Sequence, residues 1–403
     1  MNQITVVDAR MGRGKSSAAI RYMNEHKSEK RFLYITPFLT EVDRICEYCD
    51  FDQPDDESYS KSSKLKFYLR YGQNIAASHS LFNLIDEEAV ELIRKKNYTL
   101  ILDESISAIR KIQACKREVE VVQNEFATLD EEGRVTWDDP EFFGALATYR
   151  DIAMTGSLYI RDSALLQVLN PAIIRSFEDV FMLTYLFDGQ YQKGYLEYFG
   201  FDYRIVGIET DEKGYKFSDK PDCPPPIDYS KLINILDSKN MNSIGDSRTA
   251  LSKAWYLRRG KNHSDIKKLR SNLDNYFHRL TESTSNSRMW TCFIDHRDKL
   301  LYESGRYRQN FLQIASRATN EFRDKRDLAY MANRFADPNL TKFFGARGIK
   351  IDPDKFALGE MLQWIWRSAI RDEKPINIYI PSKRMRTLLL NWIEEMKQGG
   401  TNE

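Results

Sequence analysis

Short apolar runs separated by longer amphipathic stretches fill the first half of the chain. Runs of four or five residues with this character are typical of strands buried in a parallel sheet, and the stretches between them have helical patterns. The predicted strands lie at 4–7, 32–35, 98–102, 180–183 and 203–206. The pattern therefore predicts β–α–β units and an α/β domain.

The same alternation returns in the second half of the chain and predicts a second α/β domain. Its predicted strands lie at 289–294, 311–315, 328–331 and 376–380. Together the two halves predict an α/β fold with two domains, each built on a parallel sheet.

A polar stretch that ends in Cys223 and three prolines has the composition of a linker. We therefore expect a first domain over 1–212, a linker over 213–228 and a second domain over 229–403. Two long, charged stretches exceed what a minimal α/β domain needs, and their patterns predict mostly helical insertions. These insertions lie at about 105–175 and 229–288.

Composition narrows the class of protein. The 403 residues include 60 Lys and Arg against 59 Asp and Glu, which argues against a polycationic tail but allows a locally basic groove. No apolar run is long enough to span a membrane, and the N-terminus lacks the pattern of a signal peptide. Five cysteines without such a signal indicate a reducing cytosol, and the pair Cys46 and Cys49 has no second pair at zinc spacing.

A phosphate-binding loop is the clearest chemical motif. Residues 9–16, Ala-Arg-Met-Gly-Arg-Gly-Lys-Ser, follow the first strand and open a helix, as in the pattern G-x-x-x-x-G-K-S/T with Ala9 in place of the first glycine. Glycines let backbone N–H groups approach phosphate oxygens, and the helix N-terminus favours negative charge. Lys15 would reach the β- and γ-phosphates, and Ser16 would bind Mg²⁺. The expected ATP-binding residues are Gly12, Arg13, Gly14, Lys15, Ser16 and Ser17.

Two adjacent acids end another predicted strand. Residues 100–102 are apolar and lead directly into Asp103 and Glu104. In a phosphate-loop fold this strand lies near the loop, so we expect Asp103 to hold Mg²⁺ and Glu104 to orient or deprotonate the attacking water. An acidic helix cap is the alternative for such a pair.

A third pattern lies near the C-terminus. Gln363, Arg367 and Arg371 are spaced by four residues, which would place all three on one face of a helix over 363–371. Arginines suit the stabilisation of charge that develops on a transferred phosphoryl group. The alternative is a solvated helix face.

In this order, the three motifs resemble superfamily 2 helicases, most closely the DEAD-like helicases encoded by bacteriophages and prophages. The resemblance spans nearly the whole chain except the two insertions. It implies two RecA-like domains that bind ATP and Mg²⁺ and contact nucleic acid, in the cytoplasm of a bacterial host. It also makes Lys15, Asp103, Glu104, Gln363, Arg367 and Arg371 the catalytic candidates.

The resemblance implies further contacts to nucleic acid. Thr184 matches the third motif of the family, with Thr155 as a competing match. Residues 36–37 resemble the loop that contacts the backbone of the nucleic acid, and 78–79 are a further candidate contact. Residues 316–320 resemble the fifth motif, which contacts both nucleic acid and nucleotide, and ordinary capping is the alternative for these loops. These candidates are Thr36, Pro37, Ser78, His79, Thr184, Arg317, Thr319 and Asn320. Ser105 and Trp366 depart from the Ala and Gly of the family motifs, and Arg371 comes one residue late. Only eight residues precede Ala9, so adenine recognition is expected from elsewhere in the chain.

We therefore predict an ATP-driven helicase or translocase that acts on DNA in phage replication or recombination. Single-stranded or forked DNA is the favoured partner, RNA is the alternative, and a replication protein is a further candidate partner. Basic residues mix with aromatic ones at 61–71 and cluster again at 258–270, where a phosphate track competes with a solvated charged face. The rival function is an ATP-gated nucleic-acid-binding or protein-recruiting factor that does not unwind.

Overall fold

The computed structural model describes residues 3–55, 60–104, 106–223, 227–315 and 321–399. These residues form two compact units. The first unit contains residues 1–222 and 337–351, and the second contains residues 223–336 and 352–403. The predicted linker spans the junction at Asp222 and Cys223, whereas residues 337–351 lie in the first unit although the sequence pattern assigns them to the second domain.

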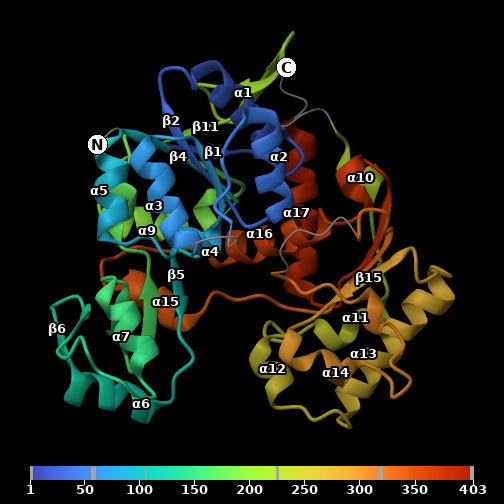
Figure 1. The fold of residues 1–403 in the computed structure, drawn as a ribbon. Coiled ribbons are helices and arrows are strands. Elements are labelled where there is room, and N and C mark those ends of the chain that lie inside the picture. The colour runs from blue at the N-terminus through green and yellow to red at the C-terminus, as the bar shows by residue number, and fades with distance from the viewer. Residues whose placement is uncertain (1–2, 56–59, 105, 224–226, 316–320, 400–403) are drawn as a thin grey trace. The chain divides into compact units, whose positions relative to one another are not determined.

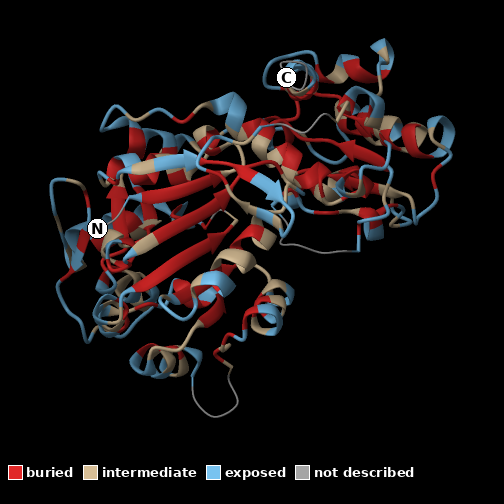
Figure 2. Ribbon diagram, turned by 90° about the horizontal axis from the view of Figure 1, so that it is seen from above, coloured by how far each residue is buried: buried red, intermediate tan, exposed pale blue. Residues whose placement is uncertain are grey.

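A six-stranded parallel sheet is the centre of the first unit (Figure 1). Its strand order is β11-β1-β10-β4-β2-β3. Five strands match the predicted runs, and nearly all their residues except those of the edge strand β11 are buried, as Figure 2 shows in red. The strands are β1 (Ile4–Asp8), β2 (Arg31–Thr36), β3 (Ile75–Ser78), β4 (Tyr98–Asp103), β10 (Asp179–Thr184) and β11 (Tyr203–Val206). The predicted α/β class is confirmed.

Helices of the first unit follow the strands, and some of them begin at a side-chain cap. Ser60 accepts a hydrogen bond from the N–H of Ser63 at the start of α3, and Asp86 accepts one from Ala89 at the start of α5. These helices are α1 (Lys15–His26), α2 (Leu39–Cys49), α3 (Lys61–Tyr71), α4 (His79–Phe82), α5 (Glu87–Lys95) and α9 (Tyr191–Tyr198). Ala18, Ala19 and Met23 form the buried side of α1.

The insertion at 105–175 contains strands as well as helices, so the prediction of a mostly helical segment is wrong there. Its strands are β5 (Ile109–Lys111), β6 (Ala127–Leu129), β7 (Val135–Trp137), β8 (Leu158–Arg161) and β9 (Ala164–Val168). Its helices are α6 (Lys116–Val121), α7 (Ala147–Met154) and α8 (Pro171–Arg175). Strands β8 and β9 form a hairpin whose two turn residues, Asp162 and Ser163, both have positive φ. These strands are too short for their alternation to stand out among the charged residues around them.

Two further segments of the first unit escaped the sequence pattern. Strands β12 (Ile208–Asp211) and β13 (Gly214–Phe217) form an antiparallel hairpin, so part of the predicted linker is ordered structure. Helix α15 (Pro338–Gly345) also packs on the first unit, where the ring of Phe343 stacks on Tyr198 at 4.4 Å between centroids. The N–H of Asp337 donates a hydrogen bond to the Tyr191 hydroxyl.

The second unit contains a four-stranded parallel sheet in the order β14-β17-β16-β15. Its strands are β14 (Ile233–Ile235), β15 (Arg288–Thr291), β16 (Asp327–Tyr330) and β17 (Ile376–Tyr379). Three were predicted. The strand predicted at 311–315 is wrong, because only an isolated bridge joins Phe311 to Trp290. Strand β14 was missed.

The predicted helical insertion at 229–288 contains four α-helices, a 3₁₀ turn, a π-helical turn and the short strand β14. Its helices are α10 (Tyr229–Leu232), α11 (Lys239–Asn242), α12 (Lys253–Leu257) and α13 (Ser264–Asn275). Helices α14 (Arg297–Leu300), α16 (Pro353–Ile365) and α17 (Lys383–Gly399) complete the second unit. Aromatic side chains such as Trp290, Tyr256 and Tyr276 are buried in its core. In the part of the chain that the structure describes, no helix combines the length and apolarity needed to cross a membrane.

Candidate nucleotide site

Strand β1, a glycine-containing loop and helix α1 form the predicted phosphate loop in the first unit. Gly12 and Gly14 have φ of +78° and +81°, a conformation that favours glycine. Gly14 is the N-cap of α1, and no side chain caps that end of the helix. The N–H groups of the first turn therefore remain available for phosphate oxygens, with Ser16 and Ser17 in that turn.

The side chain of Lys15 lies inside this loop. Its ammonium group donates hydrogen bonds to the carbonyl oxygens of Ala9 and Arg10, the latter at 3.0 Å. Burial lowers the pKa of Lys15 to about 8, although the charges of Asp103, Glu104 and Asp8 favour its protonated form. The loop thus holds a cation whose charge is sensitive to its surroundings.

Ser16 and Asp103 meet as the sequence predicted. The hydroxyl oxygen of Ser16 lies 3.4 and 3.5 Å from the two carboxylate oxygens of Asp103 at the end of β4. Burial raises the pKa of Asp103, while a hydrogen bond from Tyr34 and the charge of Lys15 act in the opposite direction. The hydroxyl of Ser16 and the carboxylate of Asp103 thus lie side by side next to the loop, within the electrostatic influence of the Lys15 ammonium group.

Tyr34 is a site residue that the sequence reasoning missed. Its hydroxyl donates a 2.7 Å hydrogen bond to Asp103, and both side chains are buried. Tyr34 lies within the apolar strand β2, which pairs with β4, so only the sheet order reveals that it faces the acid. The bond fixes the orientation of the carboxylate.

The oxygen ligands fit Mg²⁺. Among the described residues there is no group of three or more His, Cys, Asp or Glu side chains that could hold a metal ion. Mg²⁺ commonly takes one or two protein oxygens and completes its shell with phosphates and water. Ser16 and Asp103 would hold the ion in that manner.

Glu104 follows directly after β4 in a strained conformation. Its φ is +60°, which is uncommon for a residue with a side chain. Strain of this kind persists where the surrounding structure enforces it and is frequent at functional sites. The conformation turns the chain sharply at the carboxyl end of the acidic strand.

Other candidates lie along the same carboxyl edge of the sheet. Thr36 and Ser78 are paired at the ends of β2 and β3, and Pro37 follows Thr36. His79 opens α4, and its ring lies 3.2 Å from the carbonyl oxygen of Asp103. The sheet thus brings these residues close to the acidic pair, as expected where parallel strands end together.

Thr184 ends β10 beside the phosphate loop. It is in register with Asp8 of β1, and its carbonyl oxygen accepts a hydrogen bond from the N–H of Ala9 at 3.0 Å. Its hydroxyl donates to the side-chain oxygen of Gln190 at 2.8 Å. The competing Thr155 lies in the insertion, at the end of α7. The position next to the loop therefore favours Thr184.

Asp8 is a second residue that the sequence reasoning missed. Its carboxylate accepts a 3.1 Å hydrogen bond from the N–H of Phe187, which links the phosphate loop to the segment after β10. Burial raises the pKa of Asp8, against the influence of that hydrogen bond and of Lys15. In the sequence, the only indication that Asp8 belongs to the site is its position directly before the phosphate loop.

The predicted Gln-Arg-Arg helix over 363–371 is wrong in its second half. Helix α16 ends at Ile365, and Arg371 lies in a separate turn of 3₁₀-helix at 369–372. Ser368 ends the helix, because its hydroxyl and its N–H both donate to the carbonyl oxygen of Ile365, at 2.7 and 3.0 Å. The N–H of Ala369 instead donates to the carbonyl oxygen of Lys325.

Packing of tryptophan explains why this segment departs from the family motif. Trp366, which stands where the motif has glycine, is 5% exposed and packs edge-on against Trp392 and Tyr229. Gln363 and Arg367 are half-buried and Arg371 is exposed. The three residues therefore do not share one helix face.

Three predicted contacts fall outside the described residues, namely Arg317, Thr319 and Asn320. Of the basic stretches, the one at 61–71 is largely neutralised within the first unit: Lys64 pairs with Asp55, and Lys66 and Arg70 both pair with Glu88.

The thiols of Cys46 and Cys49 have pKa values raised to about 11 by burial, which agrees with a packing role.

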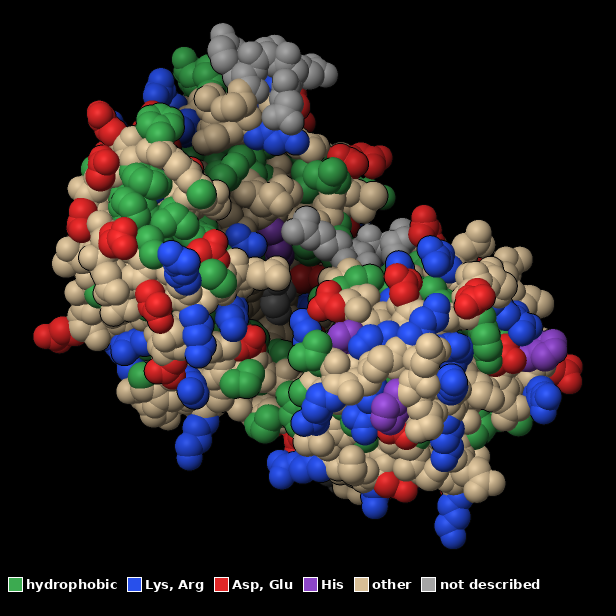
Figure 3. Space-filling model, turned by 90° about the horizontal axis from the view of Figure 1, so that it is seen from below, with side chains coloured by type: hydrophobic (Ala, Val, Ile, Leu, Met, Phe, Trp, Pro, Cys, Tyr) green, Lys and Arg blue, Asp and Glu red, His purple; other side chains and the backbone are tan. Residues whose placement is uncertain are grey.

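The second basic stretch belongs to a strongly charged part of the second unit. Residues 239–310 carry 15 Lys and Arg against 7 Asp and Glu. Blue side chains are numerous on this part in Figure 3. Exposed basic residues here include Arg258, Lys261, Lys267, Lys268, Arg279 and Arg308.

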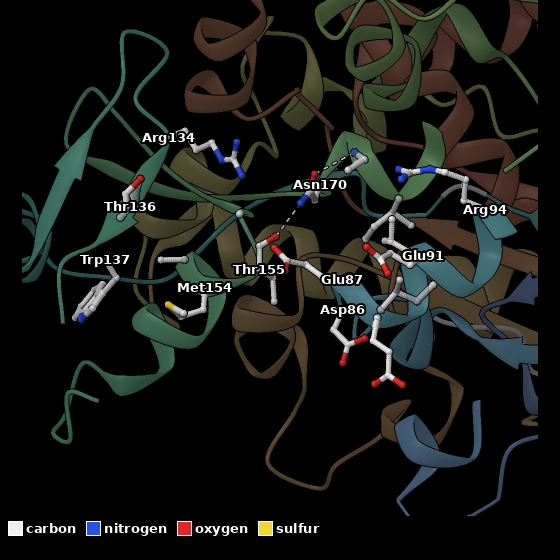
Figure 4. A pocket seen from close by; sticks show the side chains of 18 residues that line it. Asp86, Glu87, Glu91, Arg94, Arg134, Thr136, Trp137, Met154, Thr155 and Asn170 are labelled. Atoms are coloured by element: carbon white, nitrogen blue, oxygen red, sulfur yellow. Dashed lines mark hydrogen bonds between the residues drawn. The ribbon is translucent and has the colours of Figure 1, made fainter. Parts of the chain in front are cut away.

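A pocket of about 700 Å³ lies away from the phosphate loop, between α5 and the insertion (Figure 4). Glu87 and Glu91 line it from α5, and Arg134 and Trp137 line it from the insertion. Asn170 and Thr155 also line the pocket, and the side-chain amide of Asn170 donates a 3.0 Å hydrogen bond to the carbonyl oxygen of Thr155. Because both acidic and basic side chains line the pocket, its charge does not indicate one class of ligand.

Comparison with known proteins identifies relatives over the whole chain. A family model described as the YonV C-terminal Rossmann-like domain matches residues 227–393. The SPbeta prophage-derived protein YonV of Bacillus subtilis strain 168 is 37% identical over 418 aligned residues, which cover 98% of this chain and 100% of that protein.

Solved structures of XPD resemble the fold. An XPD apo structure has a TM-score of 0.51 at 11% sequence identity, covering 98% of this chain and 95% of the other. A structure of the XPD helicase has a TM-score of 0.46 at 11% identity, with 98% and 95% coverage. At such low identity the likeness to the XPD apo structure shows the fold alone, and it agrees with the α/β class.

Proposed function

The chain belongs to the family of the prophage-derived protein YonV, and from this premise and the nucleotide site we propose that it is an ATP-driven helicase or translocase. We assign it to superfamily 2, in keeping with the XPD-like fold and the order of its motifs. Its work would be on DNA during phage replication or recombination.

One observation carries the proposal. The Ser16 hydroxyl lies 3.4 Å from the Asp103 carboxylate, beside an uncapped helix N-terminus and the ammonium group of Lys15. A hydroxyl and a carboxylate from residues 87 positions apart in the chain thus lie side by side, which supports binding of a triphosphate with Mg²⁺ as in phosphate-loop ATPases. If the glycine turn had only a structural role, it would not require the carboxylate of Asp103 beside it.

In the proposed reaction each residue of the loop has a separate task. Lys15 binds the β- and γ-phosphates, the N–H groups of Gly12 to Ser17 bind phosphate oxygens, and Ser16 and Asp103 hold Mg²⁺. Bound Mg²⁺ neutralises phosphate charge. Glu104, held at the end of β4, orients the attacking water and accepts its proton.

Further proposed roles fall to residues of the second unit. We assign to Arg367, and secondarily to Arg371, the stabilisation of the charge that develops on the γ-phosphate, and to Gln363 a polar contact to it. The break after Ile365 separates Arg371 from the other two, which makes Arg367 the principal arginine.

We propose that the protein moves along nucleic acid. Thr36, Pro37, Ser78, His79 and Thr184 are the proposed contacts at the carboxyl edge of the first sheet, and Arg317, Thr319 and Asn320 are those of the second unit. The excess of Lys and Arg in residues 239–310 supports binding of a polyanion. Single-stranded or forked DNA is preferred in this proposal, and RNA is the alternative.

Hydrolysis of ATP measured with no polymer, single-stranded DNA, duplex DNA, forked DNA and RNA tests the proposal. Strong stimulation by one polymer is expected and identifies the track, after which strand separation on forked DNA distinguishes a helicase from a translocase. ATP binding with hydrolysis that no polymer changes would overturn the motor and favour a protein-recruiting switch. A chain that binds no ATP would overturn the site itself.

A further inference from the structure

The hairpin β12–β13 lies directly on the phosphate loop. A Cβ atom added to Gly14 would lie 2.4 Å from Cγ of Tyr215 and 2.5 and 2.7 Å from its two Cδ atoms. The face of the tyrosine ring therefore packs on the Cα of Gly14, at the start of α1. In Figure 1 the yellow-green hairpin lies beside the dark blue helix α1.

Residues of the loop and of α1 hold the hairpin in place. Arg21 of α1 makes two hydrogen bonds to the carboxylate of Asp211 in β12, at 2.7 and 3.0 Å. Arg13 of the loop pairs with Asp222 at 3.3 Å and donates to the carbonyl oxygen of Ile208. The ring of Phe217 stacks on Phe181 at 5.3 Å between centroids. Tyr215 is thus presented by a well-anchored strand.

Sheet order indicates which end of a nucleotide would face the hairpin. Strand β4, which carries Asp103, lies on one side of β1 with β10 between them, and β11 lies on the other side. The γ-phosphate and Mg²⁺ would lie toward Asp103, because Ser16 and Asp103 meet there. The nucleoside, at the opposite end of the phosphates, would leave the loop on the side of β11, from which the hairpin extends.

The chemistry of Tyr215 suits a planar ligand. Its side chain is 38% exposed although one face packs on Gly14, so aromatic surface remains accessible beside the loop. Aromatic side chains stack on nucleic-acid bases, and the interaction tolerates different bases because each has a π face. Lys216, the next residue, pairs instead with Glu209 at 2.8 Å, so it offers a neighbouring control position.

We propose that Tyr215 is the platform on which the base of the bound nucleotide stacks. This inference rests on the proposed nucleotide site and adds the recognition of the base, which the phosphate loop itself does not provide. Gly14 then serves twice, because its lack of a side chain permits both the positive φ and the close approach of the tyrosine ring.

Binding of MgATP and of magnesium tripolyphosphate, which has no base, separates the two ends of the site. Tyr215→Ala and Tyr215→Leu should weaken MgATP binding by about 5- to 150-fold and leave tripolyphosphate binding within about twofold, as expected for the loss of one stacked base. Tyr215→Phe should keep the wild-type affinity for both, and Lys216→Ala should change neither. Photolabelling with 8-azido-ATP should mark the hairpin of the wild type.

Each other outcome has a definite meaning. Equal weakening of both ligands in Tyr215→Ala would show that the ring only supports the shape of the loop and would overturn the stacking proposal. Unchanged binding of both ligands would overturn it as well. A wild-type protein that binds neither ligand would instead contradict the proposed function, whereas one that binds tripolyphosphate and ATP equally would contradict base recognition alone.

Discussion

The phosphate loop and the Gln-Arg-Arg segment show how differently two sequence motifs can translate into structure. In the first, the strand, the glycine turn and the helix form where the residues predict them, with φ of +78° and +81° at the two glycines. In the second, a regular spacing of four residues predicts one helix face, but the helix ends at Ile365.

The difference lies in the range of the interactions that decide each structure. A turn built on glycines depends on the backbone freedom of those residues, which is a local property. Continuation of a helix at a given residue depends on whether its carbonyl groups find other donors, and here Ser368 takes the carbonyl of Ile365 while Trp366 is held in the core. Residue spacing is therefore a weaker predictor of a shared helix face than glycine positions are of a tight turn.

The largest expected effect tests the loop. Lys15→Ala should lower the rate of ATP hydrolysis by at least about a thousandfold, because the charge that binds the β- and γ-phosphates is lost. Steady-state ATPase measurement and thermal unfolding together check this. Lys95→Ala, at an exposed position of α5, is the matched control and should retain full activity. Hydrolysis that survives in Lys15→Ala would refute the assignment of the loop.

Substitution of the two arginines tests the broken helix. Arg367→Ala should reduce kcat by about a hundredfold with the affinity for ATP changed less than about threefold, because the arginine acts on charge formed during reaction. Arg371→Ala should reduce kcat by less than about tenfold, since Arg371 lies in a separate turn. An effect at Arg371 as large as that at Arg367 would mean that the break after Ile365 has no functional consequence.

A smaller effect is expected for the residue that orients Asp103. Tyr34→Phe removes the 2.7 Å hydrogen bond and should raise the Mg²⁺ concentration for half-maximal ATPase by about tenfold. Tyr98→Phe removes a part-buried tyrosine hydrogen bond away from Asp103, to the carbonyl oxygen of Gln73, and serves as the control. If both variants show the same Mg²⁺ dependence as the wild type, Tyr34 does not position the acid.

The pH dependence of ATP binding should show the smallest effect. Lys15 has a pKa of about 8 in the free protein, and bound phosphates favour its protonated form and therefore raise that pKa. Affinity should thus fall as pH rises, by at most about tenfold between pH 7 and 9. Titration calorimetry at several pH values checks this, and Lys15→Arg should bind with little pH dependence, because arginine stays charged. Tighter binding at pH 9 would contradict the assignment.

Local patterns predicted much of the first unit. Buried strands such as β2 and β10 are apolar over four consecutive residues, so the sequence identifies them before any packing is known. The same holds for the phosphate loop and for the pair Asp103 and Glu104, whose signals lie in adjacent residues. Strand β3, with two alanines among four residues, gives too weak an apolar signal.

By itself, then, the sequence determined the α/β class and the positions of the loop and the acids, because these depend on hydrophobicity and backbone freedom over a few neighbouring residues. The tertiary structure alone decided that Tyr34 meets Asp103, that the hairpin brings Tyr215 onto Gly14 and that α16 stops at Ile365. Each of these depends on partners between 69 and about 200 residues away or on competing hydrogen bonds, and no spacing in the chain encodes them.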